Sequence, residues 1–175
     1  MAAREPTEIT FVARRLTVAV PSVREFQDTL EAAVPDQPLE QVTALVRGNA
    51  PWSKMVALLD AAAPYGFFVY SRSDPHSVMR AAGDHADCLV YQIGNHVVAE
   101  RMYRHDPRTM LYAPLRLAIW EDPQADAWLT IDQPSTLFDS LGVPEVHEVG
   151  VELDRKLGTL LAALGVAVPA PLLRS

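Results

Sequence analysis

The sequence predicts a single domain in which helices and β-strands are mixed. The chain has 175 residues, 49% of them hydrophobic, which is enough for one substantial core and too little for two domains. Two apolar segments, 115–120 and 127–131, flank a short polar turn and predict an antiparallel hairpin. Leucines and valines at helical spacing from Val149 to Leu164 predict a long final helix that Gly165 closes.

The first predicted strand covers residues 9–20, which are rich in β-branched side chains. Its alternation changes phase in the middle, and a bulge at residues 14–15 would restore it. A helix is expected over 23–34, because Ser22 and Glu25 form a capping-box pattern ahead of an apolar stripe.

Further helices and a strand are expected before the middle of the chain. Apolar residues at helical spacing predict helices over 38–47 and 51–63. A strand is expected over 67–72. A short helix is expected over 74–82, where Asp74 is a favoured N-cap residue followed by proline.

Residues 84–88 (Asp-His-Ala-Asp-Cys) contain the ligand types of zinc sites. Zinc needs three or four ligands at tetrahedral positions, which one contiguous stretch rarely supplies, so we expect an ordinary loop. Cys88 opens a buried strand and is expected to be an inert core thiol. The sequence thus predicts no metal site and no cofactor.

The middle of the chain holds the most distinctive succession of elements. A strand over 89–93 meets the turn Gly94-Asn95, and a helix is expected over 96–105 before a proline-containing connection to the hairpin. Another short helix is expected over 134–141. The apolar C-terminal tail is expected to dock either on the body of the domain or on a partner.

The charge of the chain disfavours nucleic acid as a partner. The formal net charge is -7, and Lys54 and Lys156 are the only lysines, whereas phosphate binding needs clustered cations. No apolar run reaches the roughly 18 residues of a membrane span, and the first residues lack the apolar core of a signal peptide. We therefore expect a cytoplasmic protein without a membrane partner. The single cysteine is compatible with a reducing compartment.

This succession of strand, Gly-Asn turn, helix, proline connection and two strands resembles the domain of unknown function 302 family. The likeness covers about residues 66–165, and the helices over 38–63 look like an addition. The residues that carry the resemblance are Gly94-Asn95, Pro114-Leu115-Arg116, and Asp132 with Pro134.

The resemblance implies an α+β fold similar to the TATA-binding-protein-like class. In such a fold a curved antiparallel sheet of about five strands is covered by helices on one face. Members of the family are often paired into homodimers. This sequence departs from the family pattern where His96 replaces the usual proline and where Gln133 separates Asp132 from Pro134. We expect individual chemistry at these departures.

The candidate site lies at the Gly94-Asn95 turn, where free N–H groups at a helix start favour anions. Asn95 could cap the helix or contact a ligand. The positive helix end would lower the pKa of His96, and a neutral imidazole could act as a general base. A solvent-exposed histidine is the alternative. Asp132 could orient His96 as a second catalytic residue, or it could cap the next helix. The other expected ligand-binding residues are Tyr112, Arg116, Gln133 and Arg101.

The sequence is compatible with three functions. The first is a small-ligand-binding domain with a pocket between the Gly94-Asn95-His96 turn and the hairpin end at Asp132. The second is a cofactor-independent isomerase, cyclase or lyase that uses His96 and Asp132 as acid and base on a small carbonyl metabolite. The third is a non-catalytic homodimeric interaction protein.

Overall fold

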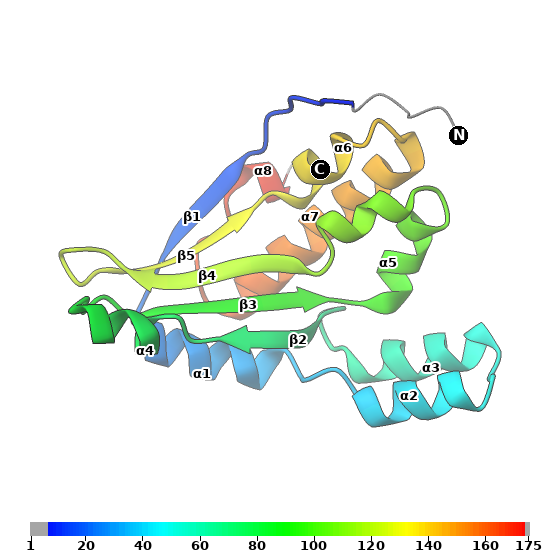
Figure 1. The fold of residues 1–175 in the computed structure, drawn as a ribbon, viewed down its shortest axis with the longest axis horizontal. Coiled ribbons are helices and arrows are strands. Elements are labelled where there is room, and N and C mark those ends of the chain that lie inside the picture. Colours follow the sequence, from blue (N-terminus) through cyan, green and yellow to red (C-terminus); the bar gives the residue numbers. More distant parts are fainter. Residues whose placement is uncertain (1–6, 174–175) are drawn as a thin grey trace, which may run out of the picture.

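A five-stranded antiparallel sheet forms the centre of the fold, in the order β1-β5-β4-β3-β2 (Figure 1). The computed structural model describes residues 7–173. The predicted hairpin is confirmed, since β4 and β5 pair antiparallel with Leu117 opposite Ile131. The strands are β1 (Arg15–Val20), β2 (Phe68–Ser73), β3 (Cys88–Gly94), β4 (Leu115–Glu121) and β5 (Ala127–Asp132).

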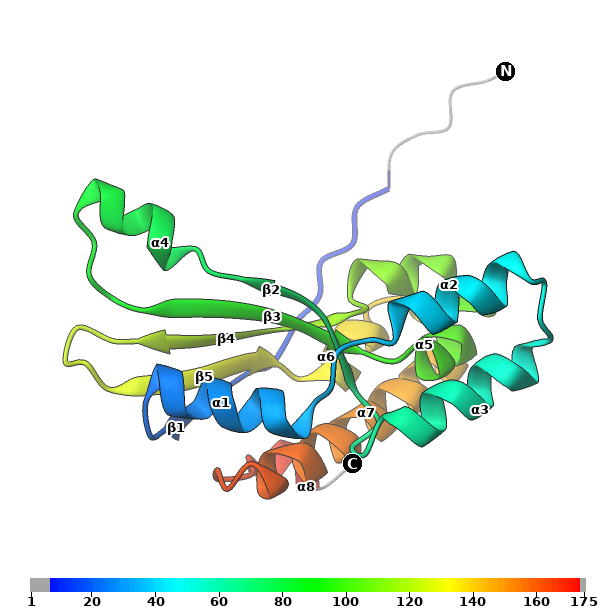
Figure 2. The same ribbon diagram turned by 90° about the horizontal axis from the view of Figure 1, so that it is seen from below.

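Helices cover one face of this sheet and leave the other open. Figure 2 shows α1 (Val23–Ala33) and α7 (Pro144–Ala163) on the same side of the strands. The strands alternate accordingly: in β4 Leu115 and Leu117 are buried, whereas Arg116 between them is exposed. The expected α+β fold with a long C-terminal helix is therefore confirmed.

The hydrophobic core lies between the covered face of the sheet and these two helices. Strand alternation and helical periodicity both direct apolar side chains into this layer. Each of the following core side chains is at most 1% exposed: Phe26, Leu30, Tyr91, Ile119, Leu157 and Leu160.

Helices α2 (Leu39–Arg47) and α3 (Trp52–Ala62) form a hairpin beside the start of β2. Figure 1 shows this hairpin beyond the end of the sheet. It has a small core of its own, in which Val42, Met55 and Leu59 pack with Phe68 of β2. This local packing explains how the two helices stay attached to the domain at one strand end.

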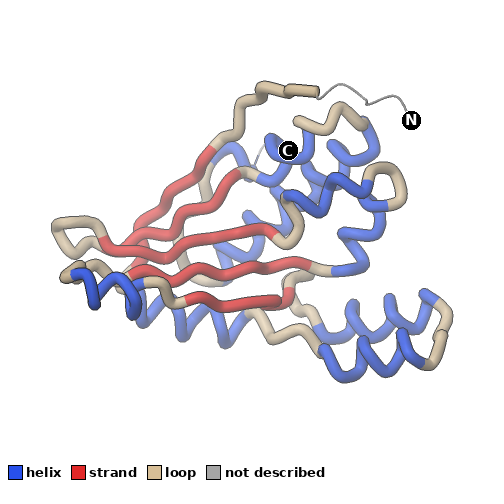
Figure 3. Tube along the Cα trace, in the orientation of Figure 1, coloured by secondary structure: helices blue, strands red, loops and turns tan. Residues whose placement is uncertain are grey.

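The remaining helices are short; all but α8, which ends the described chain, connect larger elements (Figure 3). The 3₁₀ helix η2 follows α5 and was not predicted. The C-terminal tail docks on the body through Leu172, which is 2% exposed. No described helix is long and apolar enough to cross a membrane. The short helices are α4 (His76–Met79), η1 (Arg80–Ala82), α5 (His96–Tyr103), η2 (Pro107–Leu111), α6 (Pro134–Asp139) and α8 (Ala170–Leu173).

The first strand is shorter than the sequence predicts. It begins at Arg15, opposite Asp132 at the end of β5, and the described residues before it have no regular structure. Past Asp132 the chain turns into α6, so residues 9–14 have no strand to pair with. The predicted bulge at residues 14–15 is therefore wrong. The phase change in the sequence marks the start of the strand.

Helix α7 approaches α6 closely at Gly150. A Cβ atom on Gly150 would lie 3.0 Å from the Cα of Ser135 and 3.2 Å from the Cβ of Phe138. The first of these contacts is with backbone, which cannot rotate away. A glycine in the middle of this long helix is thus required by the distance between the two helices.

We expect the substitution Gly150→Ala to lower the free energy of unfolding by about 1–2 kcal/mol. Overpacking costs about 1–3 kcal/mol, and the better helix propensity of alanine returns at most about 1 kcal/mol. Gly158 on the same helix is the matched control, because a Cβ atom there meets nothing closer than 3.4 Å. Urea denaturation of both variants measures the difference. Equal stability of the two would show that α6 does not restrict α7.

Candidate functional site

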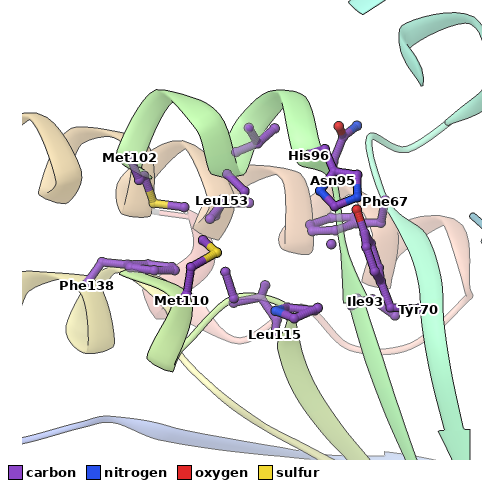
Figure 4. Close-up of a pocket in the computed structure, with 15 residues that line it drawn as sticks. Phe67, Tyr70, Ile93, Asn95, His96, Met102, Met110, Leu115, Phe138 and Leu153 are labelled. Atoms are coloured by element: carbon purple, nitrogen blue, oxygen red, sulfur yellow. The ribbon is translucent and has the colours of Figure 1, made fainter. Parts of the chain in front are cut away.

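A cavity of about 200 Å³ lies where the ends of β3 and β4 meet α5, η2 and α7. Its walls are almost entirely apolar (Figure 4). Among the described residues that line it there is no lysine, arginine, aspartate or glutamate. The main apolar side chains are Phe67, Ile93, Met102, Met110, Phe138 and Leu153.

The polar side chains of the cavity gather at one end. In Figure 4, Asn95, His96 and Tyr70 lie together, away from Met102 and Phe138 at the other end. The cavity therefore has an apolar body and one polar end. Such an arrangement suits a small molecule with a single polar group.

Gly94 allows the polar end to form. A Cβ atom at this position would lie 3.3 Å from the Cβ of Pro114 and 3.5 Å from Cε2 of Tyr70. Any side chain would push β3 away from the residue that precedes β4. The Gly-Asn turn and the proline connection, which the sequence places twenty residues apart, thus meet in the wall of one cavity.

Asn95 holds the turn in place. Its Oδ1 accepts a hydrogen bond from the N–H of Val97 at 2.9 Å, which caps α5, and its Nδ2 donates to the carbonyl of Gly66 at 3.3 Å. The side chain is buried, with 8% exposed. The capping role considered for Asn95 is the one that the structure shows.

His96 stands at the mouth of the cavity, with part of its surface exposed. Its Nε2 is 2.7 Å from Nε2 of Gln37, which lies just before α2, and its ring packs edge-on against Tyr70 with the ring centroids 5.2 Å apart. Burial of the packed part lowers the pKa of His96 from its usual value of 6.5. A neutral imidazole is therefore favoured at neutral pH.

Tyr70 is the site residue that sequence analysis missed. It lies on β2 at the point where the register with β3 shifts between Val69 and Ser71. Burial raises the pKa of Tyr70 to about 12, so its hydroxyl is protonated at neutral pH. Tyr70 falls within the strand predicted over residues 67–72. The register shift at which it lies, however, is not visible in the sequence.

The predicted partners of His96 at the hairpin end belong to other clusters. Both carboxylate oxygens of Asp132 accept hydrogen bonds from Arg15, at 2.8 and 3.3 Å. Gln133 accepts a bond from Arg14 and donates to buried Asp154 at 2.6 Å. Strand β4 separates this end of β5 from β3, so the structure does not bring Asp132 and His96 together. Asp132 also does not cap α6, whose N-cap position is Gln133.

The remaining predicted ligand-binding residues also lie outside the cavity. Tyr112 and Arg116 line a groove of about 760 Å³ on the open face of the sheet, together with Asp132. Arg101 forms an ion pair with Glu152 of α7 at 2.7 Å. Of the predicted site residues, only Asn95 and His96 thus line the cavity. Tyr112, Arg116 and Asp132 line the sheet surface, and Arg101 and Gln133 bond to residues of α7.

The acidic stretch 84–88 contains no arrangement of ligands for a metal. Among the described residues, no group of three or more histidine, cysteine, aspartate or glutamate side chains could hold an ion. Asp87 pairs with Arg80 across the loop. Burial raises the pKa of the Cys88 thiol, which disfavours the reactive thiolate.

Together these features define an α+β domain with a helix-covered antiparallel sheet and a small apolar cavity at one sheet end. The family model of the domain of unknown function DUF302 matches residues 46–164, and the chain belongs to this family. The predicted resemblance is therefore confirmed.

A solved structure shows the same fold. It is the crystal structure of an uncharacterized conserved protein DUF302 from Bacillus stearothermophilus, with a TM-score of 0.60. The similarity covers 87% of this chain and 97% of that chain at 14% sequence identity, so it concerns the fold alone. No curated protein gives a match.

The environment of His96 predicts a particular pH dependence. We expect the ring to titrate below pH 6.5, because its protonated form loses hydration in the folded protein. Below pH 6.5 the unfolded chain then binds more protons than the folded one, so stability falls as the pH falls through this window. NMR titration of the ring, assigned with His96→Gln, measures the midpoint. A midpoint at or above 6.5 would contradict the packing of the His96 ring against Tyr70.

Proposed function

We propose that the protein binds a small, largely apolar molecule in the cavity beside α5. The observation that carries this proposal is the cavity itself, which has about 200 Å³ of space and apolar walls. Apolar cavities of roughly 150 Å³ in other proteins stay dry and bind benzene. A molecule of one ring with a short substituent is therefore of the right size.

The position of the cavity supports the same proposal. Part of its wall is fixed by two short connections that meet there, the Gly94-Asn95 turn with its cap and Pro114, rather than by long loops. His96 and Met110 both border the cavity and are both exposed, Met110 to 43% of its surface. A ligand can therefore reach the cavity where small side-chain movements open it.

An enzyme remains the second candidate, on the strength of one observation. His96 has a lowered pKa and stands next to Tyr70, so a neutral base and a hydroxyl donor share the polar end of the cavity. An acid–base pair with Asp132 has no support, because that carboxylate bonds Arg15. The homodimer stays a prediction, and the open face of the sheet is the surface that would serve it.

Filling the cavity is the direct test of ligand binding. Ala99 of α5 lines the cavity, and Ala99→Leu places three further carbon atoms there. Ala162 is exposed on α7, so Ala162→Leu is the matched control. We expect toluene to cause saturable amide shifts at Val98 and Met102 in the wild type and in Ala162→Leu, and none in Ala99→Leu. Shifts that survive in Ala99→Leu, or no saturable shift in the wild type, would overturn the proposal.

Turnover separates the second candidate from the first. Incubation of the protein with a metabolite extract, followed by mass spectrometry, should leave every metabolite unchanged if the protein only binds. A compound that is consumed by the wild type and not by His96→Gln would establish the enzyme instead.

A further inference from the structure

The hydroxyl group of Tyr70 is an unsatisfied hydrogen-bond donor. Two buried side-chain oxygens among the described residues have no hydrogen-bond partner, those of Tyr70 and Thr109, and only Tyr70 lines the cavity. Buried hydroxyl groups nearly always have a partner, so each exception needs a physical reason. An unpaired buried hydroxyl lowers the stability of the folded protein, because the group gives up its hydrogen bonds to water and gains none in return.

His96 covers this hydroxyl. Figure 4 shows the Tyr70 oxygen against His96, whose ring is nearly perpendicular to the tyrosine ring. The backbone N–H of His96 partly offsets the effect of burial on the pKa of Tyr70. An N–H group is a donor, however, and cannot accept a hydrogen bond from the Tyr70 hydroxyl. The O–H of Tyr70 therefore still has no acceptor.

The His96 ring can move away from the Tyr70 hydroxyl at a small cost in free energy. Within the described part of the chain, the bond to Gln37 is the one hydrogen bond of the His96 ring. Exposed side chains change rotamer rapidly, and one such bond contributes little net stability. When the His96 ring turns toward solvent, the Tyr70 hydroxyl opens toward the polar end of the cavity.

We propose that the ligand of this cavity carries one neutral oxygen acceptor, such as a ketone, aldehyde or ester carbonyl, which accepts the O–H of Tyr70 in the place now covered by His96. This inference rests on the proposed function, because it names the chemistry of a ligand for the same cavity. The apolar part of the ligand fills the space lined by Met102, Met110 and Phe138.

The same walls exclude a charged ligand. A carboxylate would be buried without a cation, since the described lining contains no lysine or arginine and the His96 ring has turned toward solvent in the bound state. Burying an unpaired charge is far more costly than burying a carbonyl group that receives a hydrogen bond. The site therefore selects a neutral carbonyl compound over the acid of the same shape.

Three molecules of nearly equal shape test this selection. Acetophenone has a carbonyl oxygen, α-methylstyrene has a methylene group in its place, and benzoate has a carboxylate. We expect the wild type to bind acetophenone about fivefold to tenfold more tightly than α-methylstyrene, and benzoate most weakly. In Tyr70→Phe, acetophenone should lose this advantage while the affinity for α-methylstyrene stays unchanged. Calorimetric or NMR titration gives the dissociation constants.

A stability measurement checks the unsatisfied hydroxyl without any ligand. Tyr70→Phe removes a buried group that has no partner, so the urea midpoint should stay equal or rise. Tyr91 is the matched control: it is 1% exposed, and its hydroxyl donates to Glu31, so Tyr91→Phe should lower the midpoint. A lower midpoint for Tyr70→Phe as well would show that the hydroxyl already has an acceptor, and would overturn the proposal.

The outcomes distinguish this inference from the function on which it rests. If acetophenone and α-methylstyrene bind the wild type equally, or Tyr70→Phe affects both alike, the carbonyl selection is wrong and apolar ligand binding stands. If neither binds, and toluene does not bind either, the proposed function itself is wrong.

Discussion

The arrangement of this domain depends on one buried side chain, Asn95. Its side-chain oxygen caps the first turn of α5, directly after β3. Its side-chain NH₂ group donates to the backbone carbonyl of Gly66, just before β2. The start of α5 and the segment before β2, which are 29 residues apart in the chain, are thus held together by one residue that is 8% exposed. Asn95 and Phe67, which follows Gly66, both line the cavity, so these two bonds fix part of its wall. An amide is well suited here because it accepts and donates at once.

Much of the fold could be predicted from local patterns. The Ser22 cap, the β4–β5 hairpin and the long last helix each follow from a few neighbouring residues, and the structure has all three. The strand expected over residues 9–20 is present only from Arg15 on, because a strand also needs a partner and β5 ends at Asp132. Periodicity describes one segment, whereas pairing depends on two.

The candidate site was harder to predict for the same reason. His96 was found because its residue type is chemically informative, but its neighbours were not. Asp132 lies at the same end of the sheet and is separated from His96 by the width of β4, which a sequence does not show. Gln37 and Tyr70 reach His96 through the turn before α2 and a register shift in β2. These are non-local or irregular features with no local sequence signal.

The buried contact between α6 and α7 has a mechanical consequence for the cavity. Asp154 is 0% exposed and accepts hydrogen bonds from Gln133 and from the backbone and hydroxyl of Ser135. These bonds lock the wall that carries Phe138 and Leu153. The lining also contains Met110, whose flexible thioether side chain reaches the surface. The lining is therefore stiff at Phe138 and Leu153 and compliant at Met110, so the width of the cavity can change only where the methionine borders it.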